Sequence, residues 1–141
     1  MKYCSKKLLS LIIGLLVFTA TSCTYTNNEK INYYSNEKNY IEITGIIEHI
    51  VFDDEHETLY LGFSNLSHKT DDNCFKVVGE AYSIMVTYKD HIHIGKTATF
   101  VTAPKYYGDG YVMPIVALSV DGLNILEYET GFSSLIDWLK K

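Results

Sequence analysis

Residues 40–52 read Tyr-Ile-Glu-Ile-Thr-Gly-Ile-Ile-Glu-His-Ile-Val-Phe, and this stretch decides the kind of fold that the chain can form. Side chains alternate along it, which predicts a β-strand, because successive side chains of a strand point to opposite faces. One predicted face carries Ile41, Ile43, Ile47 and Val51, and the other carries Glu42, Thr44, Ile46, Glu48 and Ile50. Gly45 interrupts the pattern and predicts a bulge or sharp bend, which would let one long strand serve two sides of a small barrel.

The segments that follow predict further antiparallel strands. A charged turn at 53–57 leads into an alternating stretch around Leu59, Leu61 and Phe63, so that a hairpin is expected. A polar loop over 64–73 and a short strand over 74–78 come next. Further strands are expected at 95–103, 111–120 and 124–128, the last after the hairpin dipeptide Asp121-Gly122. Pro114 lacks an amide donor, so its strand should lie at an edge or carry a bulge there.

Two helices are expected among these strands. Residues 81–92 combine helical spacing of apolar side chains with residues that favour strands, and we predict a short helix there. A final helix should begin near Ser133 and end at Lys140 and Lys141.

This order of elements resembles the small Greek-key barrel called the OB-fold, over about residues 40–128. The resemblance implies a mainly β domain, an antiparallel barrel of five or six strands with a short helix and a C-terminal helix. An open antiparallel α+β sheet is the alternative. Such folds carry many functions, so the fold alone predicts none.

The N-terminal residues have the layout of an export signal. Lys2, Lys6 and Lys7 precede an apolar run over 8–18, which is too short to span a bilayer comfortably. Small and hydroxyl residues over 19–22 then lead to Cys23.

This arrangement resembles the bacterial lipoprotein signal, although Ala20 stands where leucine is commonest. The resemblance implies cleavage before Cys23 and acylation of Cys23, with 1–22 as signal peptide, 23–39 as lipidated cysteine and polar tether, and 40–141 as one globular domain. An ordinary secretory signal cut near Ala20 is the alternative. Thr24 is not the aspartate of the retention signal, so the outer membrane is favoured if the host is Gram-negative.

Charge restricts the partners. Without residues 1–22 the chain has 9 lysines against 17 acidic residues, a net charge of about −8, and it has no arginine. We therefore expect no nucleic-acid partner, and contact with the membrane through the lipid on Cys23 rather than through charge. With Cys23 acylated and Cys4 removed, Cys74 is expected either to be buried or to pair with another molecule.

Metal or catalytic chemistry has little support. His91 and His93 could begin a metal site if they shared a strand face, with His49 or Asp90 as further ligands. Acidic residues over 53–57 and at Asp71 and Asp72 lack the pattern of a calcium loop. No catalytic motif is found, and no cofactor is expected.

Tyrosine is enriched, with twelve in the chain. Tyr106, Tyr107, Asp109 and Tyr111 form a glycine-bearing loop that is the predicted partner-binding site for a protein, peptide or glycan. The predicted function is a lipid-anchored binding module of the envelope, such as an immunity-type lipoprotein. A small metal-binding protein using His91 and His93 and a structural lipoprotein without a ligand are the alternatives.

Overall fold

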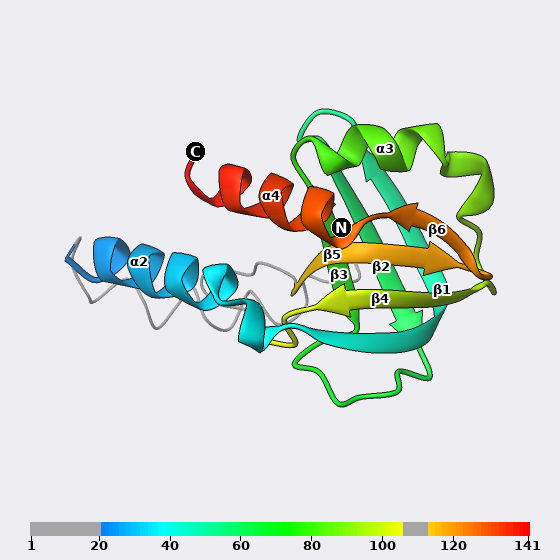
Figure 1. Cartoon of the computed structure of the whole chain (residues 1–141), viewed down its shortest axis with the longest axis horizontal. Coiled ribbons are helices and arrows are strands. Elements are labelled where there is room, and N and C mark those ends of the chain that lie inside the picture. The colour runs from blue at the N-terminus through cyan, green and yellow to red at the C-terminus, as the bar shows by residue number, and fades with distance from the viewer. Residues whose placement is uncertain (1–20, 106–112) are drawn as a thin grey trace, which may run out of the picture.

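The computed structural model describes residues 21–105 and 113–141, with side chains from residue 28 onward. Its six strands form one sheet in the order β3-β2-β1-β4-β5-β6, with helices beside it (Figure 1). The strands are β1 (Ile41–Asp53), β2 (Thr58–Ser64), β3 (Cys74–Val78), β4 (Thr97–Thr102), β5 (Met113–Val120) and β6 (Leu123–Leu126). The helices are α2 (Thr21–Ser35), α3 (Ala81–Thr87) and α4 (Tyr128–Leu139), with 3-10 turns η1 (Glu37–Asn39) and η2 (Lys89–His91).

Five of the strands close into a ring. Consecutive neighbours in the sheet are antiparallel, and β3 also pairs in parallel with β5 through Phe75 with Met113 and Lys76 with Pro114. Strand β6 extends from β5 outside the ring, and α3 connects β3 to β4. The predicted mainly β fold, with OB-like element order, a short helix and a C-terminal helix, is confirmed.

Strand β1 bends as expected, but not at Gly45. Its first half pairs with β4 and its second half with β2, and the register with β2 shifts between Ile47 and His49. The extra residue reverses the alternation, so Ile50 and Phe52 pack on the core, whereas Val51 is 38% exposed. The predicted placement of Val51 on the same face as Ile43 and Ile47 is therefore wrong.

Gly45 serves a close approach instead. A Cβ atom there would lie 2.9 Å from Cδ2 of Leu66 and 3.2 Å from Cβ of Phe63. The glycine lets the loop after β2 lie directly on β1.

The core fills the inside of the ring. The rings of Phe63 and Phe100 stack with centroids 4.4 Å apart, and Phe75 meets both edge-on. Ala81, Tyr82 and Met85 of α3 are buried against this core, so the short helix predicted over 81–92 is confirmed.

Helix α4 starts earlier than predicted. It begins at Tyr128 rather than near Ser133, and β6 ends at Leu126. The first turn is held by the ring of Tyr128, which stacks on Phe132 at 5.6 Å, while Tyr40 meets both edge-on. Pro114 is the second residue of β5, and the β4–β5 register shifts nearby, between Val101 and Thr102, in line with the predicted bulge.

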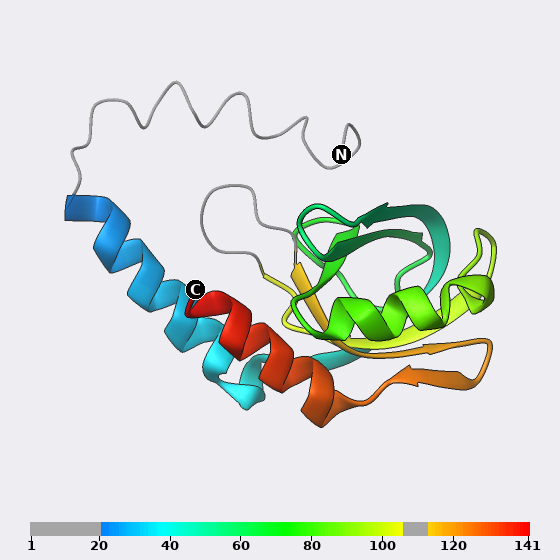
Figure 2. The ribbon, with the colours of Figure 1, turned by 90° about the horizontal axis from the view of Figure 1, so that it is seen from above.

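The segment predicted to be a polar tether is helical up to Ser35. Helix α2 packs beside α4 (Figure 2), and Tyr34 is only 2% exposed within an outer cluster formed by Tyr34, Val78, Ala103, Val116 and Leu135. The Tyr40 hydroxyl donates a hydrogen bond to the Tyr34 carbonyl at 2.7 Å. The tether prediction is therefore wrong for this part, because the tyrosines at its end bury their rings although the helix as a whole is polar.

Cys74 is buried at the start of β3, which agrees with the first of the two alternatives predicted for it, burial or pairing with another molecule. It is also disulfide-bonded in this structure of the whole chain, in which Cys4 and Cys23 are present. The two expectations for Cys74 applied to a chain that lacks Cys4 and carries an acyl group on Cys23.

Candidate functional site

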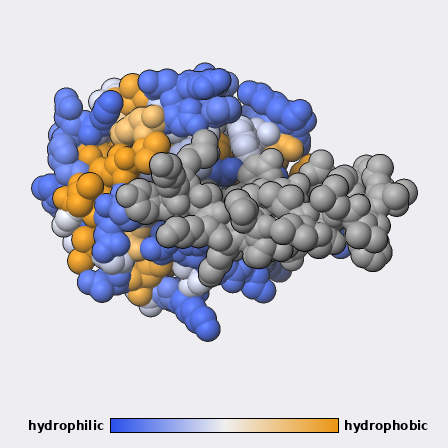
Figure 3. All heavy atoms as spheres, turned by 180° about the vertical axis from the view of Figure 1, so that it is seen from behind, coloured by the Kyte–Doolittle hydropathy of each residue, from blue (hydrophilic) through white to orange (hydrophobic). Residues whose placement is uncertain are grey.

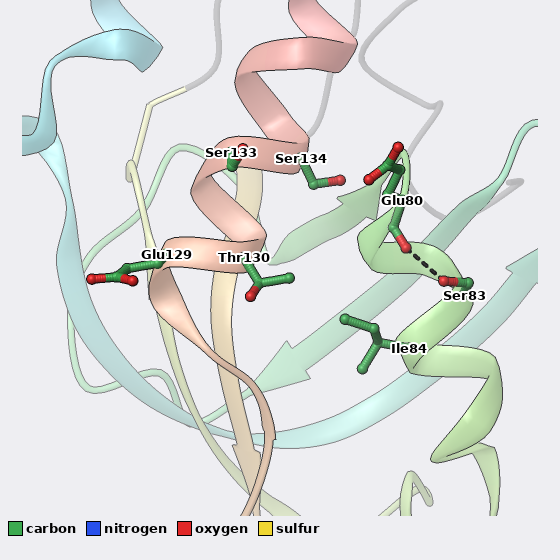
Figure 4. Close-up of a pocket in the computed structure, with 7 residues that line it drawn as sticks. All are labelled: Glu80, Ser83, Ile84, Glu129, Thr130, Ser133 and Ser134. Atoms are coloured by element: carbon green, nitrogen blue, oxygen red, sulfur yellow. Dashed lines mark hydrogen bonds between the residues drawn. The ribbon is translucent and has the colours of Figure 1, made fainter.

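A groove of about 510 Å³ lies between α3 and α4. Seven residues line it, and Figure 4 shows how their side chains lie. They are Glu80, Ser83, Ile84, Glu129, Thr130, Ser133 and Ser134.

The buried hydroxyl of Ser134 in α4 links this helix to the start of α3. The Ser134 hydroxyl donates to the carbonyl of Val78 at 2.8 Å and accepts from the amide of Ala81 at 2.9 Å. That amide is one of the unpaired donors at the start of α3, which a side chain of α4 thus satisfies. The groove is therefore a preformed feature of the packed domain.

The groove suits a positively charged donor. Glu80 leans towards α4, Thr130 and Ile84 face each other across the gap, and Glu129 points away from α3 at the rim (Figure 4). Two of the seven lining residues are acidic and none is basic. Carboxylates and hydroxyls accept hydrogen bonds, so a lysine ammonium or an arginine guanidinium matches this lining.

A second, smaller concavity of about 260 Å³ lies on the outer side of β4, β5 and β6. Glu42 and Glu127 are among its lining residues, so it is also acidic. From behind, the described surface is mostly polar, with an apolar area at the end away from α2 (Figure 3). Among the described residues the exposed large apolar side chains are Val51, Val86, Ile94 and Leu123.

The predicted histidine site does not form on a strand. His91 lies in η2 and His93 in the following turn, where its Nε2 lies 2.5 Å from the Asp90 carbonyl oxygen. His49 is on β1, next to Gly62. In the part of the chain that the structure describes, no three His, Cys, Asp or Glu side chains lie close enough to share a metal ion.

The acidic turn after β1 is held by local hydrogen bonds. The carboxylate of Asp53 accepts from the amide and from Nδ1 of His56, at 3.2 and 2.9 Å. The Tyr82 hydroxyl donates to Asp54, and burial together with this bond raises the pKa of Tyr82 to about 12. These contacts fasten the turn to α3.

The predicted binding residues Tyr106, Tyr107, Asp109 and Tyr111 lie outside the described residues. The structure places the two ends of their loop. The Lys105 carbonyl accepts a hydrogen bond of 3.0 Å from the Tyr34 hydroxyl, and Met113 pairs with Phe75.

A cluster that the sequence did not reveal surrounds Trp138. Its ring has Nζ of Lys76 at 4.3 Å and Nζ of Lys30 at 5.6 Å from the centroid. Burial and the nearby Lys30 lower the pKa of Lys76 to about 7. These residues come from β3, α2 and α4, so only the tertiary structure brings them together. The one local signal is that Lys76 interrupts the apolar strand over 74–78.

Comparison with protein-family models, with curated proteins and with solved structures finds no match to this chain. Among the helices of residues 21–105 and 113–141, none is long and apolar enough to cross a bilayer.

Proposed function

We propose that the protein is a non-catalytic binding module, anchored to an envelope membrane by lipid on Cys23, which recognises a basic segment of a partner protein in the α3–α4 groove. The observation that carries the binding part is the lining of that groove, which has the Glu80 carboxylate, several hydroxyls and no basic side chain among its seven residues. The anchor rests on the lipoprotein-like sequence before Cys23.

The charge of the exported chain supports a basic partner. With a net charge of about −8 and no arginine, the chain attracts cationic surfaces and speeds their encounter. An immunity-type lipoprotein that neutralises a basic toxin would be one instance. The loop that contains Tyr106, Tyr107, Asp109 and Tyr111 belongs to the proposal as a second contact region.

The anchor is tested by the mass of the mature protein. Mass spectrometry of protein from the membrane fraction should give a chain that starts at Cys23 and carries acyl groups, because two or three acyl chains are needed for stable attachment. Cys23→Ser should release the protein from membranes. A mature chain that starts elsewhere or has no acyl mass would contradict the anchor.

The groove is tested by reversing its charge. Glu80→Lys/Thr130→Lys places two ammonium groups at exposed positions of the groove and should abolish capture of a partner from envelope extract. The matched control Glu48→Lys/Thr44→Lys makes the same changes on exposed positions of β1. Both variants should melt close to the wild type.

Equal capture by the groove variant and the control would remove the groove from the proposal. If Ala at Tyr106, Tyr107 and Tyr111 abolished capture instead, the loop would be the main contact. Absence of any captured partner with the wild type would favour the structural lipoprotein.

A further inference from the structure

Lysines gather at one end of this acidic molecule. Two of them, Lys30 and Lys76, flank the ring of Trp138. Lys140 and Lys141 follow Trp138 directly in the chain and are exposed, as is Lys105 at the end of β4, beside Tyr34. We call the five lysines the basic end; Lys105, Lys140 and Lys141 are its exposed members, whereas Lys30 and Lys76 are buried, at 9% and 6% exposure.

Acidic residues also lie near the basic end, since the Asp71 amide donates to the Pro104 carbonyl, next to Lys105, at 3.3 Å. The exported chain has 17, of which α2 contains only Glu29 and the last turn of α4 only Asp137. The groove lies at the opposite end of α4, with Glu129 and Thr130 in the first turn. A helix of twelve residues is about 18 Å long, which separates Glu129 from Lys140, whereas Glu80 comes closer because the adjacent Gly79 lies against Trp138.

The basic end and the proposed anchor lie on the same side. Helix α2 contains Cys23 and is fixed beside α4 by the outer cluster. The start of α2 and the end of α4 project from the ring in the same direction (Figures 1 and 2). Lys30 lies seven positions after Cys23 in α2, a rise along the helix of about 10 Å. An acyl chain on Cys23 would therefore bring the basic end to the headgroups.

We infer that the basic end binds the phosphate headgroups of anionic phospholipids, so that the anchored domain turns its acidic groove away from the membrane. This inference rests on the proposed anchor at Cys23. Lysines near an anionic surface are attracted to it, and tryptophan favours the interface between lipid and water. The average charge of the chain argues against such contact, but the Debye length of about 10 Å at moderate salt lets one end act independently of the other.

Trp138 is the only tryptophan in the chain and therefore reports on this end alone. The acylated protein would be reconstituted into vesicles of phosphatidylcholine, alone or mixed equally with phosphatidylglycerol, with a trace of headgroup spin-labelled lipid. Quenching of Trp138 fluorescence should be stronger in the anionic vesicles. It should fall to the neutral-vesicle value in 1 M salt, where the Debye length is about 3 Å.

Lys140→Gln/Lys141→Gln should lower the equilibrium constant for the docked orientation by roughly 30-fold. Quenching of Trp138 should then be the same in both kinds of vesicle. The matched control Lys69→Gln/Lys89→Gln removes two exposed lysines outside the basic end and should behave like the wild type. The two C-terminal lysines also interact with the dipole of α4, but that contribution is the same in both kinds of vesicle.

Flotation with the vesicles separates the two possible failures. Protein that floats but shows equal quenching in both kinds of vesicle would overturn this inference and leave the anchor standing. Equal behaviour of the two double variants would overturn it as well. Protein that does not float would overturn the anchor and this inference together.

Discussion

Gly131 lies where α4 crosses β5, and a methyl group has no room there. A Cβ atom at this position would lie 2.1 Å from the carbonyl oxygen of Val116, 2.6 Å from its carbonyl carbon and 2.8 Å from its Cα. All three are backbone atoms, so no side-chain rotation relieves the clash. In Gly131→Ala, α4 must therefore move by at least 0.9 Å to reach a separation of 3.0 Å, below which Cβ contacts essentially never occur.

Two effects of opposite sign decide the stability of this variant. Overpacking costs about 1–3 kcal/mol, and an unyielding backbone places this site near 3 kcal/mol. Alanine is a better helix former than glycine by about 1 kcal/mol. The net loss in the free energy of unfolding should be about 2 kcal/mol, which lowers the melting temperature of a domain of this size by roughly 8–16 °C.

Far-UV circular dichroism and the fluorescence of Trp138, which lies on α4, would follow the thermal unfolding. Thr130→Ala is the matched control, because it changes the neighbouring exposed residue of the same turn and should leave the melting temperature unchanged or slightly raised. If Gly131→Ala melted at or above the wild-type temperature, helix propensity would outweigh packing here, and the close docking of α4 on β5 would be refuted.

Two further predictions concern buried polar groups. Ser134→Ala leaves the Ala81 amide without its acceptor and should lower the free energy of unfolding, measured in urea, by about 1–3 kcal/mol. The control Ser133→Ala changes an exposed serine and should stay within about 0.5 kcal/mol of the wild type. Equal effects of the two substitutions would argue against the hydrogen bond between Ser134 and Ala81. Because the pKa of Lys76 is about 7 in the folded protein and 10.5 ordinarily, the unfolded chain binds more protons between these values, and stability should rise from about pH 7 to about pH 9. Lys76→Met should remove that rise and Lys69→Met should retain it, as measured by urea unfolding at the two pH values; a rise that persisted in Lys76→Met would assign it to another group.

The sequence predicts the strands well where alternation is regular, and fails where one residue changes the register. The side chains of β1 up to Ile47 follow the predicted alternation. Beyond it the bulge reverses the pattern, and Gly45 gives no hint of this position because it serves the approach of Leu66. The position of a bulge depends on the partner strand, and the alternation of side chains within one strand carries no information about that partner.

Contacts between distant segments account for the other differences. Helix α2 reads as a polar tether because burial of Tyr34 requires Val116 and Leu135 to be in place. The α3–α4 groove likewise combines residues about fifty positions apart, and no local motif marks Glu80 or Thr130. Lysine enrichment around Trp138 is hidden by the overall acidity of the chain, since composition averages over both ends.

A short parallel pairing between β3 and β5 closes the ring of strands. Among residues 21–105 and 113–141, two residue pairs connect β3 to β5, and one of them contains Pro114, which has no amide hydrogen to donate. The paired residues are 38 positions apart, fewer than the 51 to 61 positions that separate the partners in the β1–β4 pairing, so the weakness of this pairing comes from its shortness rather than from loop entropy. Amide exchange in β3 should then be faster than in β1 or β2, and opening of the ring would begin at this pairing, beside Lys76 and the end of the loop that contains Tyr106, Tyr107, Asp109 and Tyr111.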